Sequence, residues 1–228
     1  MRQEILKFDF KFNSNEFFVS VKNNLAFNLI ENWPLWKNKF VYIYGPEGCG
    51  KTTICKIWEK KSKAIYLSQQ KLQQLINSNF EMNDLNSKNW ILDNLDVLIN
   101  KKGSSYDKRI LNFLNFIKSS NKSFLLITSK TSPKNLDTNL QDLISRLSSM
   151  LVVEVKEPDE DLLMKIIEKY LLDRRIKLDR NIIIFILNRI ERTYKSALKI
   201  SKMIDKHSLA NHSQISKKFI SNILKQSN

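Results

Sequence analysis

The sequence predicts an α/β fold, in which a five-stranded parallel sheet lies between layers of helices and a small all-helical region follows. Two observations support this prediction. Short β-branched and aromatic segments alternate with longer amphipathic segments up to residue 155, which is typical of a parallel sheet wound on both faces. Beyond Glu157 and Pro158 only helical periodicity remains. We therefore expect an N-terminal segment, a core and a helical lid, at 1–14, 15–157 and 158–228.

Five segments have the composition of strands, because β-branched and aromatic residues gather in them between turn-forming or polar residues. The first, FVYIY, is bounded by Gly45 and is expected to be buried. The five expected strands lie at 40–44, 64–68, 89–93, 123–129 and 151–155.

Apolar residues at helical spacing predict the helices. In the core these cover about 21–33, 51–61, 70–76, 107–118 and 140–150, and in the lid about 159–174, 179–190, 193–206 and 215–226. Pro34 ends the first of them, because proline lacks the amide hydrogen that a helix interior requires. The β-branched run NIIIFIL at 181–187 lies between helical patterns, so we expect a buried helix there.

The composition indicates a globular protein with an anionic partner. Of the 228 residues, 42% are hydrophobic and 27% charged, which argues against disorder. The net charge of +15 favours nucleic acid, nucleotide, an acidic protein or a lipid surface as partner. Two cysteines make no disulfide framework, and we find no membrane span and no secretion signal. A cytoplasmic protein is the simplest expectation.

The strongest motif is GPEGCGKT at 45–52, which fits G-x-x-x-x-G-K-[ST] at every fixed position. In such a phosphate-binding loop, glycines let backbone N–H groups surround the phosphates, the lysine neutralises them and the following hydroxyl ligates Mg²⁺. A glycine turn without a ligand is the alternative, but three of the four glycines of the chain lie here. We take Cys49 as a small filler rather than a redox switch. The expected nucleotide contacts are Gly45, Pro46, Glu47, Gly48, Cys49, Gly50, Lys51, Thr52 and Thr53.

A second acidic motif follows the expected strand of WILDNLD at 90–96. In P-loop proteins an aspartate here holds Mg²⁺, usually through water, so we expect Asp93 and Thr52 to form the metal site. An ordinary polar turn is the alternative. Hydrolytic P-loop proteins usually have an acid next, whereas this chain has Asn94, which can position water but cannot accept its proton. We expect nucleotide binding with weak or no intrinsic hydrolysis, unless Asp96 substitutes as the base.

The order of these elements resembles the AAA+ class, and within it the initiator clade: the ATPase domain of DnaA and the shorter DnaA-related proteins of the Hda type, including alphaproteobacterial members. Residues 15–30 resemble the linker F-V-x-G/S-x-x-N-x-x-A, whose Val19 and Asn23 would border the adenine. LLITS at 125–129 resembles the sensor I strand, with Thr128 or Ser129 as its polar tip.

Two arginines acquire roles through the same resemblance. DLISRL at 142–147 resembles the box VII helix, whose Arg146 would be an arginine finger that acts in trans on a neighbouring subunit's nucleotide. RTYKSAL at 192–198 resembles sensor II, whose Arg192 would contact nucleotide in cis. An arginine of this kind is otherwise a surface group, solvated or ion-paired. Lys130 departs from the aspartate common in DnaA, and the intact loop leaves the choice between ATP and ADP open.

The N-terminal QEILKF at 3–8 resembles the peptide by which Hda-type proteins bind the replicative sliding clamp. Gln3, Leu6 and Phe8 match it, and Glu4 stands where leucine is usual. An edge strand packed on the core is the alternative. The chain ends about where the lid should end, so we expect no helix-turn-helix domain and no base-specific DNA recognition.

Together these features predict a nucleotide-binding regulator of chromosomal replication initiation. With ATP or ADP and Mg²⁺ bound, and with the DNA-loaded clamp, it would promote ATP hydrolysis by DnaA. The alternatives are a free-standing ATPase and a DnaA-like protein that associates with DNA or loads another factor. Loose, non-specific DNA contact and homodimer formation are compatible with this prediction, and no membrane partner is expected.

Overall fold

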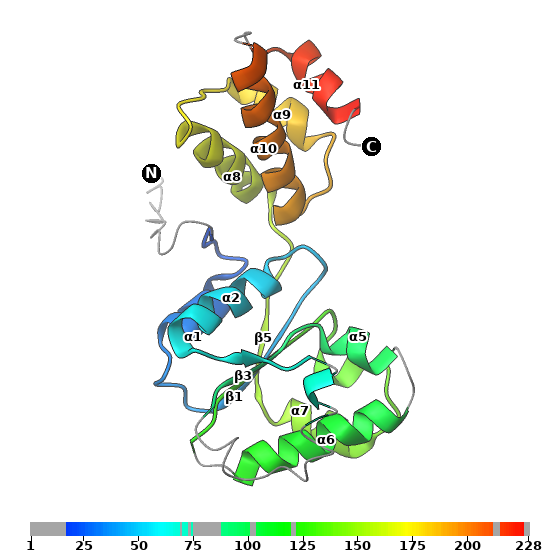
Figure 1. Ribbon diagram of the computed structural model, residues 1–228. Coiled ribbons are helices and arrows are strands. Elements are labelled where there is room, and N and C mark those ends of the chain that lie inside the picture. The colour runs from blue at the N-terminus through cyan, green and yellow to red at the C-terminus, as the bar shows by residue number, and fades with distance from the viewer. Residues whose placement is uncertain are drawn as a thin grey trace, which may run out of the picture. The chain divides into compact units, whose positions relative to one another are not determined.

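The computed structural model describes residues 17–68, 70–72, 74, 88–100, 104–119, 122–211 and 215–225 (Figure 1). Its chain contacts divide into two compact units. The core unit comprises Asn23–Lys156, and the helical unit joins residues 17–22 to the chain from Glu157 onward. The segment 17–22, which the sequence placed with the core, therefore packs with the helices.

The core unit contains a five-stranded, fully parallel sheet with the order β2-β3-β4-β1-β5, which confirms the predicted fold class. β1 lies between β4 and β5, and every residue of β3 and β4 is buried. Such burial explains why these strands are continuous apolar runs rather than alternating ones. The strands are β1 (Phe40–Tyr44), β2 (Ile65–Tyr66), β3 (Trp90–Leu92), β4 (Leu125–Ser129) and β5 (Leu151–Glu154).

Helices cover both faces of this sheet: α1 and α2 lie on one side, and α6 and α7 on the other (Figure 1). On the second side, α6 and α7 pack an apolar core against alternate strand residues such as Tyr42 and Ile127. On the α2 side, Trp36 stacks on Trp58 with ring centroids 5.1 Å apart. The described helices of the core unit are α1 (Asn24–Glu31), α2 (Lys51–Ser62), α5 (Leu95–Asn100), α6 (Ser104–Ser119) and α7 (Gln141–Ser148), with a 3₁₀ turn η1 (Pro133–Asn135).

Sequence periodicity missed helix α5 and the turn η1. The backbone at Asn94 adopts a left-handed conformation (φ 57°), which turns the chain sharply after β3. Leu95 and Ile99, one helical turn apart, are then both buried. Six residues give too short a pattern to separate such a helix from the strand before it. Of the helix expected at 70–76, residues 70–72 and 74 are helical, and the rest lies outside the described residues.

The helical unit contains four described helices, as predicted: α8 (Glu160–Leu172), α9 (Arg180–Leu187), α10 (Tyr194–Asn211) and α11 (Lys217–Lys225). The β-branched run in α9 is indeed helical, because it buries Ile183, Ile186 and Leu187 in the core of this unit. Asp159 caps α8 by accepting a hydrogen bond from the Leu162 N–H at 2.9 Å, an interaction worth about 1 kcal/mol.

The segment 17–22 contacts α10. The Phe17 ring stacks on the Tyr194 ring with centroids 6.1 Å apart, and the Tyr194 hydroxyl donates to the Phe18 carbonyl at 3.2 Å. None of the helices in the described part of the chain is long and apolar enough to cross a membrane.

Candidate nucleotide-binding site

The loop at 45–50 connects β1 to α2 and depends on glycine at two positions for different reasons. A Cβ on Gly45 would lie 2.0 Å from the Val155 carbonyl oxygen, so the loop can approach the chain after β5 only without a side chain. Gly50 precedes α2 with φ 102°, a conformation that L side chains rarely adopt. The motif therefore presents the N-terminus of α2, with its unsatisfied N–H groups, at the end of a central strand.

Lys51, the first residue of α2, is held inside this loop. Its side chain is 6% exposed, and its ammonium donates to the carbonyls of Gly45 at 2.6 Å and Pro46 at 2.8 Å. These bonds fix a positive charge beside the helix N-terminus, where an anion is favoured. Glu47 is exposed, whereas Gly48 and Thr53 are half-buried.

Cys49 is buried beneath the loop, with its Sγ 3.8 Å from the Lys51 Nζ. Burial raises the pKa of the Cys49 thiol, although the nearby Lys51 charge opposes this. The protonated thiol is a poor nucleophile and a poor redox centre. This environment agrees with a filler rather than a switch.

Three predicted site residues from different elements meet at one point. The Thr52 hydroxyl on α2 donates to Asp93 Oδ2 at 2.9 Å, and the Thr128 hydroxyl on β4 donates to Asp93 Oδ1. They converge because β3, β4 and β1 are neighbours in a parallel sheet and end at the same edge.

Thr52 and Asp93 suit a magnesium ion, which prefers hard oxygen ligands. No cluster of three or more His, Cys, Asp or Glu side chains that could hold a metal occurs among the described residues. A metal here would thus take its other ligands from phosphate and water, as Mg²⁺ commonly does beside a nucleotide. The two residues fit such an ion.

Cys55 is a neighbour of this carboxylate that sequence reasoning did not single out. Its Sγ lies 3.9 Å from Asp93 Oδ1. Burial, with the Asp93 charge as a second cause, raises the pKa of the Cys55 thiol well above its usual value. Cys55 therefore stays protonated and serves as a weak donor to the carboxylate.

Asn94 turns the backbone after β3, in addition to its predicted role of positioning water. Its left-handed conformation is one that asparagine tolerates better than most residues, and its N–H donates to the Thr128 hydroxyl at 3.0 Å. Asp96, two residues further along the chain, accepts from the Ser129 hydroxyl at 3.2 Å and from the Lys130 N–H at 2.9 Å. Asp96 thus holds the loop after β4.

An ion pair links this loop to the phosphate-binding loop. Lys130 Nζ lies 2.8 Å from Glu47 Oε2, and the side chains are 46% and 81% exposed. The hydrogen bond to Glu47 raises the pKa of Lys130. Water screens so exposed a pair, so it orders the loops weakly.

Arg146 lies on α7, whose Leu143 and Leu147 face the core. Within the described chain its guanidinium forms no ion pair. It lines a hollow of about 320 Å³ between α6 and α7, together with Lys118 and Asp142. The finger candidate is thus a partly exposed cation on the surface of the core unit.

The remaining predicted residues lie apart from the loop in the chain. Asn23 is buried at the start of α1 in the core unit. Val19 belongs to the helical unit, as does Arg192, which precedes α10 with Nη2 3.8 Å from Glu160 Oε2. The clamp-peptide residues Gln3, Leu6 and Phe8 lie outside the described residues.

The family model of the ATPase family associated with various cellular activities (AAA) matches residues 41–155, half of the chain. An uncharacterized protein of Haemophilus influenzae is 27% identical over 212 residues, covering 89% of both chains. The chromosomal replication initiator protein DnaA of Porphyromonas gingivalis is 24% identical over 207 residues, covering 79% of this chain. The match spans only 41% of that initiator's length.

Solved structures share the fold. Domain III of Thermotoga maritima DnaA has a TM-score of 0.72 at 19% identity, with 91% of this chain and 93% of that one covered. AMPPCP-bound DnaA of Aquifex aeolicus has a TM-score of 0.73 at 20% identity, with 92% and 68% covered. A RuvB of Thermotoga maritima has a TM-score of 0.63 at 15% identity, with 90% and 67% covered. At such identities the likeness concerns the fold alone.

Proposed function

The chain belongs to the AAA family of ATPases, and from this premise we propose that it binds ATP or ADP with Mg²⁺ and regulates replication initiation by promoting ATP hydrolysis in DnaA. The observation that best supports this proposal is a contrast within the core unit, between the nucleotide site and Arg146 on α7. The nucleotide loop is complete, but the carboxylates beside it are engaged, whereas Arg146 forms no ion pair among the described residues.

Nucleotide binding would use groups whose geometry is already described. The N–H groups of the loop and of the α2 N-terminus would cradle the phosphates, and Lys51 would neutralise them. Thr52 and Asp93 would hold Mg²⁺, which supplies further charge neutralisation when bound. By resemblance, Val19 and Asn23 would border the adenine and Arg192 would approach the phosphates.

Slow hydrolysis by the chain itself follows from its carboxylates. Asp93 accepts from two threonine hydroxyls, and an oxygen of Asp96 is bonded to the loop after β4. Asn94 offers an amide, which orients water without taking its proton. The chain would therefore leave bound ATP unhydrolysed for long periods.

Arg146 would act on a neighbour instead. When α7 docks beside the nucleotide of DnaA, the guanidinium would stabilise the charge that spreads over the γ-phosphate oxygens in the transition state. Because Arg146 forms no ion pair among the described residues, its guanidinium can enter such a contact without first breaking one. The DnaA-like fold and the similarity to DnaA in sequence support this choice of partner. Residues 3–8 would tether the chain to the clamp.

The deciding experiment is a DnaA ATPase assay with the clamp loaded on DNA. The wild-type chain is expected to accelerate hydrolysis, and Arg146→Ala to reduce the rate to the unstimulated background while binding nucleotide normally. Arg180→Ala, which removes an exposed arginine at the start of α9, is the matched control and should retain stimulation. Full stimulation by Arg146→Ala would reject the finger.

The same assay without DnaA tests the chief alternative. A steady-state rate of about 1 s⁻¹ or more from the isolated chain, in the ordinary range of enzymes, would favour a free-standing ATPase. Deleting residues 1–8 should abolish clamp binding in a pull-down, and retained binding would reject the peptide assignment.

A further inference from the structure

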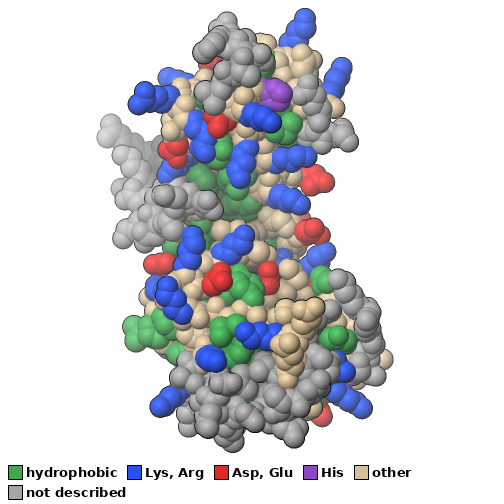
Figure 2. Space-filling view, in the orientation of Figure 1, with side chains coloured by type: hydrophobic (Ala, Val, Ile, Leu, Met, Phe, Trp, Pro, Cys, Tyr) green, Lys and Arg blue, Asp and Glu red, His purple; other side chains and the backbone are tan. Residues whose placement is uncertain are grey.

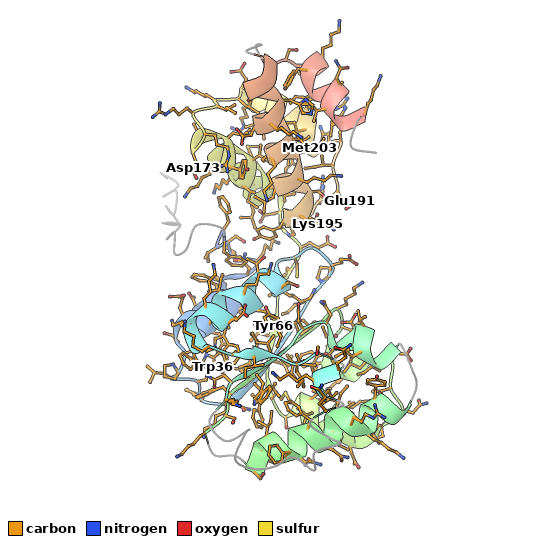
Figure 3. The ribbon with its side chains drawn as sticks, viewed as in Figure 1. Trp36, Tyr66, Asp173, Glu191, Lys195 and Met203 are labelled. Carbon is orange, nitrogen blue, oxygen red and sulfur yellow. The ribbon has the colours of Figure 1, made fainter. Side chains whose placement is uncertain are left out.

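A groove in the helical unit has an apolar floor and a cationic rim. It encloses about 410 Å³ between the first half of α10, the loop before it and Leu224 of α11. We propose that it binds an acidic peptide segment carrying an apolar side chain. Its lining residues Glu191, Lys195 and Met203 are marked in Figure 3. The groove lies wholly within the helical unit, and none of its lining residues is among those assigned above to the nucleotide, DnaA or the clamp.

The floor consists of aliphatic side chains and a methionine. Ile200 is buried, whereas the others are only partly buried: Ile190, Met203 and Leu224. An apolar side chain placed here would remove their remaining surface from water, and each Å² is worth roughly 25 cal/mol. Met203 is a flexible, polarizable side chain that adapts to the shape of its occupant. The floor therefore favours one apolar side chain over a purely charged ligand.

The rim adds three cations and one acid: Arg189, Lys195, Lys199 and Glu191. The Arg189 guanidinium is held in place, because it lies 3.6 Å from the Phe185 ring centroid and donates to the Phe185 carbonyl at 3.1 Å. A guanidinium has five N–H donors, so the hydrogen bond to the Phe185 carbonyl leaves other donors for a carboxylate. Carboxylates that flank the apolar side chain would complement this charge.

The one acid of the rim is committed to the helix behind it. Glu191 Oε2 accepts from the Ser196 hydroxyl at 3.4 Å, at the N-terminus of α10. A carboxylate there is favoured by the helix dipole. Among the described lining residues three cations outnumber this one acid, so the groove attracts anions despite Glu191.

The floor also distinguishes a peptide from nucleic acid. None of the described residues that line the groove is aromatic, whereas many proteins hold single strands by stacking bases on aromatic side chains. Basic side chains are spread over the helical unit (Figure 2). On α10, Lys202 and Lys206 follow Lys199 on the same exposed face, about one and two turns further, and neither lines the groove. A phosphate backbone would use all four lysines, whereas a peptide in the groove would use Lys195 and Lys199.

The test is a selection of random twelve-residue peptides, displayed on phage, against the full chain. The enriched sequences should place Asp or Glu around a Leu, Ile, Phe or Met. A fluorescein-labelled copy of an enriched peptide, titrated by anisotropy, should bind Lys195→Glu/Lys199→Glu about tenfold more weakly, since each reversal converts attraction into repulsion. Met203→Gln, which places a polar group in the floor, should weaken the same peptide several-fold, about as expected for a lost apolar contact.

Lys202→Glu/Lys206→Glu is the matched control, because it makes the same charge change on the same helix outside the groove. It should alter the affinity less than about threefold at 0.15 M salt, where screening is strong. Equal weakening by both double variants would overturn the groove. The proposal would also be overturned if the selection enriched no peptide, or only basic peptides. The same holds if a 20-nucleotide oligothymidylate bound more tightly than the peptide and its binding depended on all four lysines. Unchanged melting temperatures exclude misfolding, and Met203→Gln carries the test if a charge reversal unfolds the chain.

Discussion

The core unit and the helical unit use their charged residues in different ways. In the core unit, Lys51 is 6% exposed and bonded to two carbonyls, and Asp93 accepts from two threonines. In the helical unit, the Arg192 side chain is 68% exposed and lies 3.8 Å from Glu160. Charges held by several hydrogen bonds near the strand ends keep one geometry, whereas exposed charges exchange partners readily. This contrast indicates that the core unit holds its ligand with side chains in fixed positions. The exposed charges of the helical unit are better suited to contacts that can rearrange.

The largest expected effect tests whether the two units are stable separately. Ile204→Ala removes a fully buried side chain from the helical unit and should cost that unit about 2–5 kcal/mol. Hydrogen exchange should then quicken in α8–α11 while β1 and β4 keep their protection. Ile127→Ala in β4 is the reciprocal variant, and it should weaken the sheet first. Equal loss of protection everywhere would mean that the units unfold together.

The next effect tests the buried charge of the core unit. Lys51→Ala should weaken ATP binding about 100-fold, because hydrogen bonds to charged groups contribute about 1.5–3 kcal/mol. Isothermal titration with Mg²⁺-ATP measures this change. Lys56→Ala, on the exposed side of α2, is the control and should bind normally. Nearly normal ATP binding by Lys51→Ala would show that Lys51 is not the central group of the nucleotide site.

A smaller effect concerns Tyr66 of β2, which is labelled in Figure 3. Its hydroxyl is buried and has no hydrogen-bond partner among the described residues. Tyr66→Phe should stabilise the protein by about 1 kcal/mol, since an unpaired buried hydroxyl is costly. Tyr42→Phe should destabilise it similarly, because the Tyr42 hydroxyl donates to the Thr131 carbonyl at 3.0 Å. Urea unfolding at pH 7 compares the two variants, and a destabilised Tyr66→Phe would contradict the expectation.

The same tyrosines set a pH dependence. Burial raises the pKa of both Tyr42 and Tyr66 above the ordinary value of 10.0. A raised pKa in the folded state means that the folded protein holds its proton where the unfolded chain loses it. Their contribution to stability is therefore complete below pH 10 and declines as the pH rises above it. Tyr66→Phe should lose less stability than the wild type between pH 9 and 11.

The smallest effect belongs to the exposed ion pair between the two loops. Glu47→Gln breaks the contact with Lys130, and it should leave the melting temperature unchanged because solvent screens the pair. Nucleotide affinity, measured with Mg²⁺-ATP, should also change little. A large loss of affinity would show that Glu47 belongs with the fixed charges of the core unit.

Much of the architecture was predictable because its signals are local. The strand at 40–44 and the loop at 45–52 are contiguous motifs, and the helices of the lid show regular apolar spacing. The β-branched α9 was predictable from its neighbours. Helix α5 was not, because its six residues follow β3 directly and only the left-handed backbone at Asn94 separates them.

The sequence alone determined the features that lie within single segments. These are the phosphate-binding loop, the strand and helix segments that show a clear pattern, and the identity of Lys51, Thr52 and Asp93. Only the tertiary structure decided what depends on distant segments meeting. The need for glycine at position 45 comes from the Val155 carbonyl, and the attachment of residues 17–22 comes from Tyr194. Parallel strands and packed helices join residues about a hundred or more positions apart, and no local pattern records which of them will touch.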